Sequence, residues 1–306
     1  TTLDRSSENV VYFPYLQNFQ YAGYERRTNQ HTENLGVTFF DQVSSCGTAT
    51  AVSVPCMFSL QFRDSFDLKA ADSQQNLLDL AALAGVDVLW IDNNNGCKRV
   101  CERVAYQQID PAQDSPLCDG DYCFDEVMLA PLAAKLENID SESTLIVLHM
   151  IGSHGPTYYR RYPHSARAYQ PDCERSDIQN CSKAALVNTY DNTVLYSDQV
   201  NAMVIRQLQQ YQDKYDVSLL YVSDHGESLG EKGLYLHGFP YALAPGEQTH
   251  VPLYVWSGSG SANAGECLAD VRHEPLSHDN IYHSVMSLIG VESTLHDASL
   301  DIFSHC

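Results

Sequence analysis

The sequence predicts an α/β fold with a mostly parallel central sheet and helices on both faces. Short apolar runs of strand length alternate along the chain with longer stretches of helical periodicity, as in proteins built from repeated strand and helix units. Several of these apolar runs end in polar side chains, which is typical of the carboxyl ends of parallel strands. Because we find no internal repeat and no long Gly/Ser-rich linker, we expect residues 1–306 to form a single domain.

The predicted elements follow one another in a regular order. Apolar runs indicate strands at 10–15, 36–43, 86–91, 144–150, 217–222 and 251–256. Amphipathic patterns indicate helices at 77–83, 127–136 and 186–211. The small residues at 48–51 are expected to open a further helix, whose free amide groups would face a phosphate group.

The chain is strongly acidic. It carries 18 Lys and Arg residues against 39 Asp and Glu residues, which gives a formal net charge of -21. Nucleic acids bind to clustered cations, so we expect no nucleic-acid partner. An anionic lipid surface would also repel this chain. No apolar run approaches the ~20 residues that cross a bilayer, so we expect the chain as it stands to be soluble. We also expect it to be a monomer.

The ten cysteines indicate an oxidising compartment such as the bacterial periplasm. Eight of them form close couples along the chain, which are Cys46 with Cys56, Cys97 with Cys101, Cys118 with Cys123, and Cys173 with Cys181, while Cys267 and Cys306 are left over. The paired CxxC spacing of a zinc ribbon is absent, so short-range disulfides are the better interpretation. Free thiols in a cytosolic enzyme fit the even count less well.

A carboxylate and an imidazole follow the apolar run at 217–222. Asp224 and His225 stand where a buried strand would emerge, and Gly226 permits the turn that lets both side chains face one ion. This pattern predicts a metal site at the edge of the sheet. The alternative for an isolated Asp-His pair is a surface turn in which the Asp caps a helix.

Other strand ends supply further polar side chains. Asn94 and Lys98 follow the run at 86–91, and His154 follows the run at 144–150. His237 and Thr48 are expected to complete this polar set. We expect a strand-end residue with a satisfied hydrogen bond at His149, and surface residues at His31, His164, His250, His273, His296 and His305.

Four motifs carry a resemblance to a known family. They are CGTATAVSVPC, HMIGSHGP, NTYDNTVLYSD and SDHGESLGEKGLYLHG. Together they resemble the catalytic domain of the bacterial lipid A phosphoethanolamine transferases, a family that includes the mobile colistin-resistance enzymes and lies in the alkaline phosphatase superfamily. The resemblance runs from about Gly23 to His283. It implies an alkaline-phosphatase or sulfatase-like fold.

The resemblance also implies roles for single residues. Thr50 would be the nucleophile, and would bind a zinc ion together with Asp224 and His225. The remaining members of the set would hold the phosphoethanolamine group or a second zinc ion, and these are Thr48, Asn94, Lys98, His154 and His237. The family further implies a phosphatidylethanolamine donor, a lipid A phosphate acceptor, and an N-terminal transmembrane domain, absent from this chain, that anchors the enzyme at the periplasmic face of the inner membrane. Polymyxin and colistin resistance would follow.

One position departs from the family pattern. The family has a fourth zinc ligand, a glutamate in a Gly-Glu-Thr motif, which would fall near Tyr12, where no carboxylate stands. The nearest acids are Glu8 and Glu25. Either residues 1–21 are altered, or the site lacks one ligand and binds zinc weakly. The intact remainder of the pattern favours an altered N-terminal segment.

The chemistry of a metal-activated threonine agrees with transfer of a phosphoryl group, because a bound cation lowers the pKa of a hydroxyl and a helix N-terminus favours the resulting oxyanion. The sequence is also compatible with two other functions. One is a phosphatase or phosphodiesterase of the same superfamily, with water as the acceptor. The other is a non-catalytic domain that only binds lipid headgroups.

Overall fold

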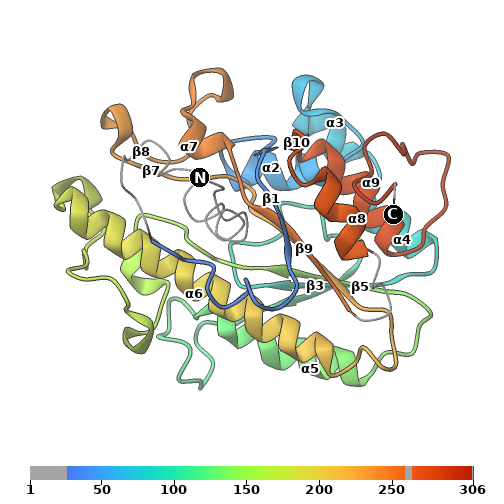
Figure 1. Cartoon of the computed structure of the whole chain (residues 1–306), viewed down its shortest axis with the longest axis horizontal. Helices are drawn as coiled ribbons and strands as arrows, with labels where there is room; N and C mark the ends of the chain where they lie inside the picture. Colours follow the sequence, from blue (N-terminus) through green and yellow to red (C-terminus); the bar gives the residue numbers. More distant parts are fainter. Residues whose placement is uncertain (1–25, 259–263, 305) are drawn as a thin grey trace, which may run out of the picture.

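The computed structural model of the chain describes residues 26–258, 264–304 and 306. Its first sheet is wholly parallel: β3 (Asp87–Asp92) lies between β4 (Ala105–Gln108) and β5 (Thr144–His149). These strands lie near the centre of the molecule in Figure 1. The parallel direction places the carboxyl ends of β3 and β5 at the same edge, with Asp92 opposite His149.

The second sheet is antiparallel. Its central strand β9 (Leu253–Ser257) pairs with β1 (Thr38–Phe40) on one side and with β6 (Ser218–Val222) on the other. The α/β class is therefore confirmed, although the parallel pairing is concentrated in the first sheet. The chain between β6 and β9 returns without a long crossover helix, and a return of that kind reverses the next strand.

Four short strands complete the described sheet structure. β2 (Val43–Ser44) pairs in parallel with β10 (Leu276–Ser277), and β7 (Ser228–Leu229) pairs with β8 (Tyr235–Leu236) in an antiparallel hairpin. The β2 and β10 pair ties the segment before α2 to the segment before α9. It therefore joins two parts of the chain that are more than two hundred residues apart in sequence.

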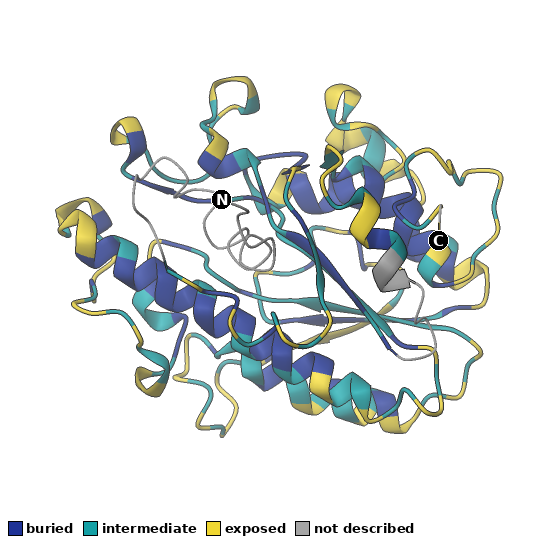
Figure 2. Cartoon of the chain, viewed as in Figure 1, coloured by how far each residue is buried: buried dark blue, intermediate teal, exposed yellow. Residues whose placement is uncertain are grey.

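Helices cover both sides of the sheets (Figure 1). α5 (Leu129–Glu137) and the long α6 (Lys183–Gln209) lie on one side, and α6 is buried along most of its length (Figure 2). The other side carries α2 (Thr50–Met57), α3 (Leu68–Ser73), α4 (Leu77–Leu83), α8 (Ala264–Val271) and α9 (Asp279–Leu288).

Shorter helical turns lie mainly in the connections. They are α7 (Gly246–Thr249), η1 (Arg63–Ser65), η2 (Asp125–Met128), η3 (Tyr158–Arg160), η4 (His164–Ala166), η5 (Ile178–Asn180), η6 (Glu231–Gly233) and η7 (Tyr241–Leu243). Several of them lie in the two long loops after β5 and β6. No helix among the described residues combines the length and the hydropathy needed to cross a bilayer.

The core follows from the alternation of side chains along the strands. Val88 and Trp90 of β3 pack into the cluster shared with α2, α4 and α9, whereas Leu89 and Ile91 face the opposite side. The same rule holds for β5, where Val147 joins the first cluster and Leu148 packs against α5 and α6. Each strand is therefore apolar on both faces, as the unbroken apolar runs in the sequence predict.

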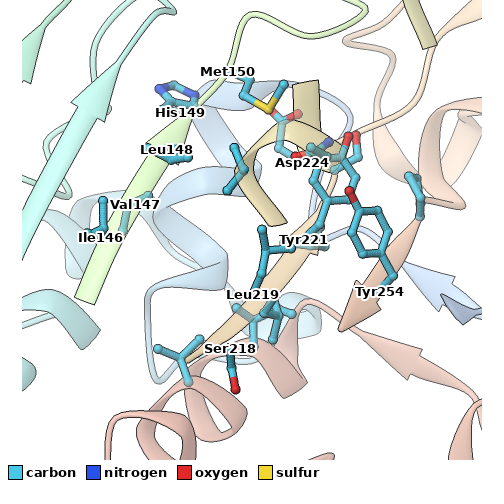
Figure 3. A pocket seen from close by; sticks show the side chains of 18 of the residues that line it. Ile146, Val147, Leu148, His149, Met150, Ser218, Leu219, Tyr221, Asp224 and Tyr254 are labelled. Atoms are coloured by element: carbon cyan, nitrogen blue, oxygen red, sulfur yellow. The ribbon is translucent and has the colours of Figure 1, made fainter. Parts of the chain in front are cut away.

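A cavity of about 1040 Å³ lies between β5 and β6, the facing edges of the two sheets. Figure 3 shows Ile146 and Leu148 on one wall and Leu219 and Tyr221 on the other. His149 and Asp224 lie at one end of the cavity, so the polar ends of both strands open into the same space.

Most of the predicted strands and helices are present within a few residues of their expected bounds. The single strand expected at 36–43 is wrong, because the chain breaks at Asp41 into β1 and β2, and the Asp41 amide donates to the Arg272 carbonyl instead. The strand expected at 10–15 lies outside the described residues. The sequence did not indicate β4, α3, α8 and α9, and β4 is exposed along its length and carries no apolar run.

All four local disulfides predicted from the cysteine spacing are confirmed. The two left-over cysteines, Cys267 and Cys306, form a fifth. This last bond closes 39 residues, the longest loop of the five, and so removes the most conformational freedom from the unfolded chain. It fixes Cys306, at the end of the segment that follows α9, to Cys267 of α8.

A buried carboxylate on α6 predicts a pH dependence of stability. Asp198 is 8% exposed and accepts hydrogen bonds from the Thr32 hydroxyl and from the His31 amide, the latter at 2.7 Å. Burial raises the pKa of Asp198 to about 7. A carboxyl whose pKa is raised by folding favours the folded state when protonated, so its contribution is full below pH 3.8 and is lost as the pH rises through 7.

Asp198→Asn should therefore raise the free energy of unfolding at pH 8 by about 2 to 4 kcal/mol and change it little at pH 4. Urea unfolding at both pH values measures this difference. Asp213→Asn, which removes the same charge from an exposed position, controls for net charge. An equal effect of Asp198→Asn at both pH values would contradict the assignment.

Candidate active site

The candidate nucleophile Thr50 is the first residue of α2. The turn before it is ordered by local hydrogen bonds: the Ser45 hydroxyl donates to the Gly47 carbonyl at 2.6 Å, and the Gly47 amide donates to the Ser53 hydroxyl at 3.0 Å. The residue at the N-cap position of α2, Ala49, has no polar side chain and does not cap the helix. The positive end of the helix dipole is thus left for a ligand, as the sequence predicts.

Asp224 and His225 form the turn that follows β6. The His225 amide donates to the Asp224 carboxylate at 3.1 Å, and the His225 Nδ1–H donates to the Gly226 carbonyl at 3.1 Å. The second bond leaves the lone pair on Nε2, which lies 3.3 Å from the Thr50 hydroxyl. Burial acts to raise the pKa of Asp224, but His225 and a hydrogen bond from Thr50 outweigh it and hold this pKa below its usual value.

Gly226 is the residue that allows this turn to form. A Cβ atom at this position would lie 2.1 Å from the Glu247 carbonyl oxygen, so any other side chain would collide with the backbone of α7. The Gly226 amide also donates to the Gln248 carbonyl at 3.0 Å. The sequence predicts that this glycine permits the turn and leaves room for an incoming group, and the structure adds the close approach of the α7 backbone as a further constraint.

Three histidine rings gather beside this turn. The ring centroid of His237 lies 4.3 Å from that of His225 and 4.8 Å from that of His154. The His154 and His237 rings are each held by their Nδ1 atom, at 2.7 Å from the Gly155 carbonyl for His154 and at 2.9 Å from the Glu227 carboxylate for His237. Their Nε2 atoms are therefore left for a ligand.

Glu227 was missed in the sequence and organises this cluster. It is 3% exposed and also accepts from the Gly155 amide and the Tyr158 hydroxyl, both at 3.1 Å. Burial acts to lower the pKa of His237, but the hydrogen bond to Glu227 outweighs it and raises this pKa. Glu227 stands three residues after Asp224, so its place in the same motif was the available signal.

Asp92 holds the loop that carries Asn94. It is fully buried and accepts from the Trp90 indole at 2.9 Å, from the His149 Nδ1–H at 2.8 Å and from the Asn94 amide at 2.9 Å. The Asn94 side chain donates to the Met150 carbonyl at 3.1 Å, which joins the loops after β3 and β5. The expectation of a satisfied hydrogen bond at His149 is confirmed.

The remaining two predicted residues, Thr48 and Lys98, differ in whether they contact the other site residues. Thr48 lies beside the cluster, since its hydroxyl donates to the Phe239 carbonyl at 2.5 Å and its carbonyl accepts from the Gly238 amide at 2.7 Å. Lys98 donates to the Asn95 carbonyl at 2.6 Å within its own loop. The structure therefore brings together all the predicted site residues except Lys98, whose described hydrogen bond does not reach the others.

The histidines expected at the surface divide into two groups. His164 and His273 are exposed, as predicted. His31, His250 and His296 are only partly exposed, and the Nε2–H of His250 donates to the Asp41 carbonyl at 2.8 Å. His305 lies outside the described residues. A polar side chain in a loop can be covered by another segment, which the local sequence does not show.

The donor atoms at the first turn of α2 suit a zinc ion. A carboxylate from Asp224, the Nε2 lone pair of His225 and the hydroxyl of Thr50 are the oxygen and nitrogen donors that zinc takes. The described part of the chain contains no group of three or more His, Cys, Asp or Glu side chains placed to hold a metal. The residues near Tyr12, where a fourth ligand was expected, lie outside that part.

Comparison with known proteins places this arrangement in a family. The sequence profile of the sulfatase family matches residues 8–291. The chain belongs to the sulfatase family. Its structure superimposes on the soluble domain of lipooligosaccharide phosphoethanolamine transferase A from Neisseria meningitidis with a TM-score of 0.89 and 39% identity, covering 96% of this chain and 90% of that domain.

Curated relatives agree with the sulfatase-family match. The chain is 43% identical to phosphoethanolamine transferase EptA of Escherichia coli K12 over 95% of this chain and 54% of that protein. It is 40% identical to phosphatidylethanolamine transferase Mcr-1 of Escherichia coli over 89% of this chain and 51% of that protein. The chain thus spans about half the length of these relatives.

Within this sulfatase-family site, Asp92 offers a test of the loop geometry. Burial acts to raise the pKa of Asp92, but the hydrogen bonds from His149 and Trp90 outweigh it and lower this pKa. A carboxyl whose pKa is lowered by folding contributes stability above its unfolded pKa of 3.8, and this contribution is lost as the pH falls through the folded value.

Asp92→Asn should lower the free energy of unfolding by about 2 to 4 kcal/mol at pH 7, because an amide cannot accept all of these bonds. The loss should shrink below pH 4, where the wild-type carboxyl is also protonated. Chemical unfolding at pH 7 and pH 3 measures both values, with Asp110→Asn at an exposed position as the control. If the loss of unfolding free energy were the same at both pH values, the charge of Asp92 would not contribute to stability.

Proposed function

We propose that the chain transfers phosphoethanolamine from phosphatidylethanolamine to a phosphate of lipid A, through a covalent intermediate on Thr50. The observation that carries this proposal is the 3.3 Å separation between the Thr50 hydroxyl and the His225 Nε2 atom at an uncapped helix N-terminus. The names of the relatives, which are phosphoethanolamine and phosphatidylethanolamine transferases, support the transferred group and the donor.

The transfer takes place in two displacements. The Thr50 oxygen attacks the phosphorus of the donor, the bond from phosphorus to the diacylglycerol oxygen breaks, and the hydroxyl proton ends on that oxygen. A lipid A phosphate oxygen then attacks the same phosphorus, and Thr50 is released and regains a proton. Two steps with a covalent intermediate produce ping-pong kinetics.

The residues around Thr50 hold the phosphoryl oxygens during these steps. Thr50, Asn94 and His154 line the same cavity, and the His154 and His237 rings lie beside the ring of His225. Thr48 lies two residues before Thr50 and is bonded to the Phe239 carbonyl. We assign the N-terminal amides of α2 and these side chains to the phosphoryl oxygens. Phosphoryl transfer needs little beyond such donors and cations around the equatorial oxygens. Lys98 would add a cation if its side chain turns from the Asn95 carbonyl towards the phosphate.

Zinc is the proposed cofactor, held by Thr50, Asp224 and His225, with a second ion near His154 and His237 as a further element of the proposal. A bound zinc ion supplies positive charge that lowers the pKa of the Thr50 hydroxyl. The His225 Nδ1 contact with the Gly226 carbonyl orients the ring for this role, since metal-binding histidines commonly donate their other N–H to such an acceptor.

The proposed location is the periplasmic face of the inner membrane. Five disulfides are consistent with an oxidising compartment. A full-length relative from Neisseria meningitidis, 40% identical over 95% of this chain and 55% of that protein with a TM-score of 0.89, is described as an integral membrane protein. Adding an ammonium group to lipid A lowers its negative charge, so weaker binding of cationic polymyxins such as colistin would follow.

The covalent intermediate is directly testable. Incubation of the chain with phosphatidylethanolamine in detergent micelles should place a phosphoethanolamine adduct on Thr50, identified by mass spectrometry of the digested protein. Thr50→Val, which keeps the shape but removes the hydroxyl, should abolish the adduct, and Thr50→Ser should retain part of it.

Full transfer to lipid A by Thr50→Val would exclude this mechanism. Release of phosphoethanolamine into water at the same rate with and without lipid A would instead identify a hydrolase. A chain that binds the donor and forms no adduct would be a headgroup-binding domain.

Zinc binding offers a second, independent test. The chain should hold about one zinc ion, and Asp224→Asn should lower this content about tenfold or more, because one of the donors is neutralised. Elemental analysis after dialysis against a weak chelator measures the content. Asp140→Asn, an exposed carboxylate elsewhere, is the control and should leave it unchanged. Equal zinc content in the two variants would show that Asp224 is not a zinc ligand.

A further inference from the structure

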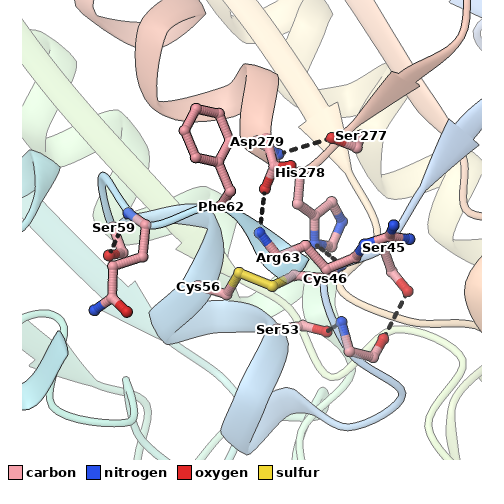
Figure 4. Close-up of a disulfide and its surroundings, with 12 residues drawn as sticks. Ser45, Cys46, Ser53, Cys56, Ser59, Phe62, Arg63, Ser277, His278 and Asp279 are labelled. Atoms are coloured by element: carbon pink, nitrogen blue, oxygen red, sulfur yellow. Dashed lines mark hydrogen bonds between the residues drawn. A yellow bond between two sulfur atoms is a disulfide. The ribbon is translucent and has the colours of Figure 1, made fainter. Parts of the chain in front are cut away.

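A buried histidine outside the predicted site joins the two turns that form it. His278 is 1% exposed and precedes α9. Its Nδ1 atom lies 3.0 Å from the Cys46 amide nitrogen, and its Nε2 atom lies 3.0 Å from the Ser223 carbonyl oxygen. Figure 4 shows this ring beside the disulfide of Cys46 and Cys56.

The two contacts determine the tautomer of His278. A backbone amide only donates, so Nδ1 must present its lone pair to Cys46. A carbonyl oxygen only accepts, so Nε2 must carry the proton that is donated to Ser223. The ring is therefore neutral with its proton on Nε2, and both of its polar atoms are used by backbone groups.

Each partner of His278 belongs to a turn that carries a site residue. Cys46 lies four residues before Thr50 and is bonded through its sulfur to Cys56 in α2. Ser223 comes directly before Asp224, and its hydroxyl donates to the His225 carbonyl at 2.8 Å. The imidazole therefore connects the turn of the nucleophile to the turn of the carboxylate and imidazole.

The backbone around His278 is itself anchored. Its amide donates to the Ser44 carbonyl at 3.0 Å, which continues the pairing of β10 with β2. The next residue, Asp279, accepts from the Arg63 amide at 2.9 Å (Figure 4). A side chain that projects from such a fixed position holds its partners at a set separation.

We propose that His278 is a positioning residue, which sets the separation of the Thr50 hydroxyl from Asp224 and His225 by bridging their two turns. This inference rests on the proposed function and adds to it a residue that contacts no substrate. Displacement of a reacting group by about 1 Å is enough to lower a rate about 100-fold, so loss of this bridge should act on the chemical step.

The chain offers a matched control in α9, the helix that follows His278. His283 of α9 is 5% exposed, and its Nδ1 atom accepts from the Asp297 amide at 3.0 Å. It is thus a buried histidine with a backbone donor, as His278 is, but its partner belongs to the segment after α9 and not to a site turn. A general loss of packing should affect both positions alike.

The experiment compares His278→Leu, His278→Gln and His283→Leu in the full chain. For each variant we measure kcat and KM for transfer from phosphatidylethanolamine, the rate of adduct formation on Thr50, and the urea midpoint. His278→Leu should lower kcat about 30-fold or more while KM changes about threefold or less, because the loss falls on the chemical step. His278→Gln has one acceptor and one donor at its tip and should restore kcat to within about fivefold of wild type.

His283→Leu should lower the urea midpoint but leave kcat within about twofold of wild type. If His278→Leu does not fold, it is replaced by His278→Asn, which keeps an acceptor for Cys46. The kcat of His278→Asn should lie between that of wild type and the value predicted for His278→Leu. The positioning role is overturned if His278→Leu and His283→Leu have the same kcat, or if His278→Gln is as slow as His278→Leu. A wild-type chain that forms no adduct on Thr50 would overturn the proposed function itself, and the positioning role with it.

Discussion

The site depends on one contact, the approach of the Thr50 hydroxyl to the His225 ring at 3.3 Å. The two residues are 175 positions apart and belong to different turns, so neither turn alone determines their separation. The turn of His225 is held from one side by α7, whose backbone approaches Gly226 too closely for a side chain. The turn of Thr50 is held by the pairing of β2 with β10 and by the disulfide of Cys46.

Buried carboxylates order the loops around this contact. Asp92 fixes the loop after β3 by accepting hydrogen bonds from Asn94 and His149. Glu227 connects the loop that carries His154 to His237. Asp125 does the same for the loop after β5, since it accepts from the Ile151 and Gly152 amides at 2.9 and 2.8 Å. A charged group is buried at low cost only when several donors surround it, so each carboxylate imposes a defined geometry on its loop.

The positions of the site residues along the chain were largely predictable. Asp224, His225, Asn94 and His154 each follow an apolar run. Asn94 and His154 follow the parallel strands β3 and β5, which end at a common edge, so the meeting of these two loops follows from periodicity and topology. Asp224 and His225 follow β6 of the other sheet, and they meet the first two across the cavity between β5 and β6. Local cysteine spacing predicted four disulfides for a similar reason, because nearby thiols meet without help from the rest of the fold. These features depend on short stretches of sequence.

Other features could be identified only in the folded chain. The position of Glu227 in the Asp224 motif is a weak signal, and the sequence around His278 resembles that of any histidine before a helix. Their roles are evident only from the groups that they contact in the folded chain. An apolar run looks the same in a parallel and in an antiparallel strand. The sequence therefore did not indicate that β9 is antiparallel to its neighbours, or that the strands form two sheets. The sequence by itself therefore determined which side chains stand at strand ends and which cysteines pair locally, because both depend on neighbours along the chain. Only the tertiary structure decided which buried groups hold those ends together, because hydrogen bonds between distant segments depend on packing that local periodicity does not encode.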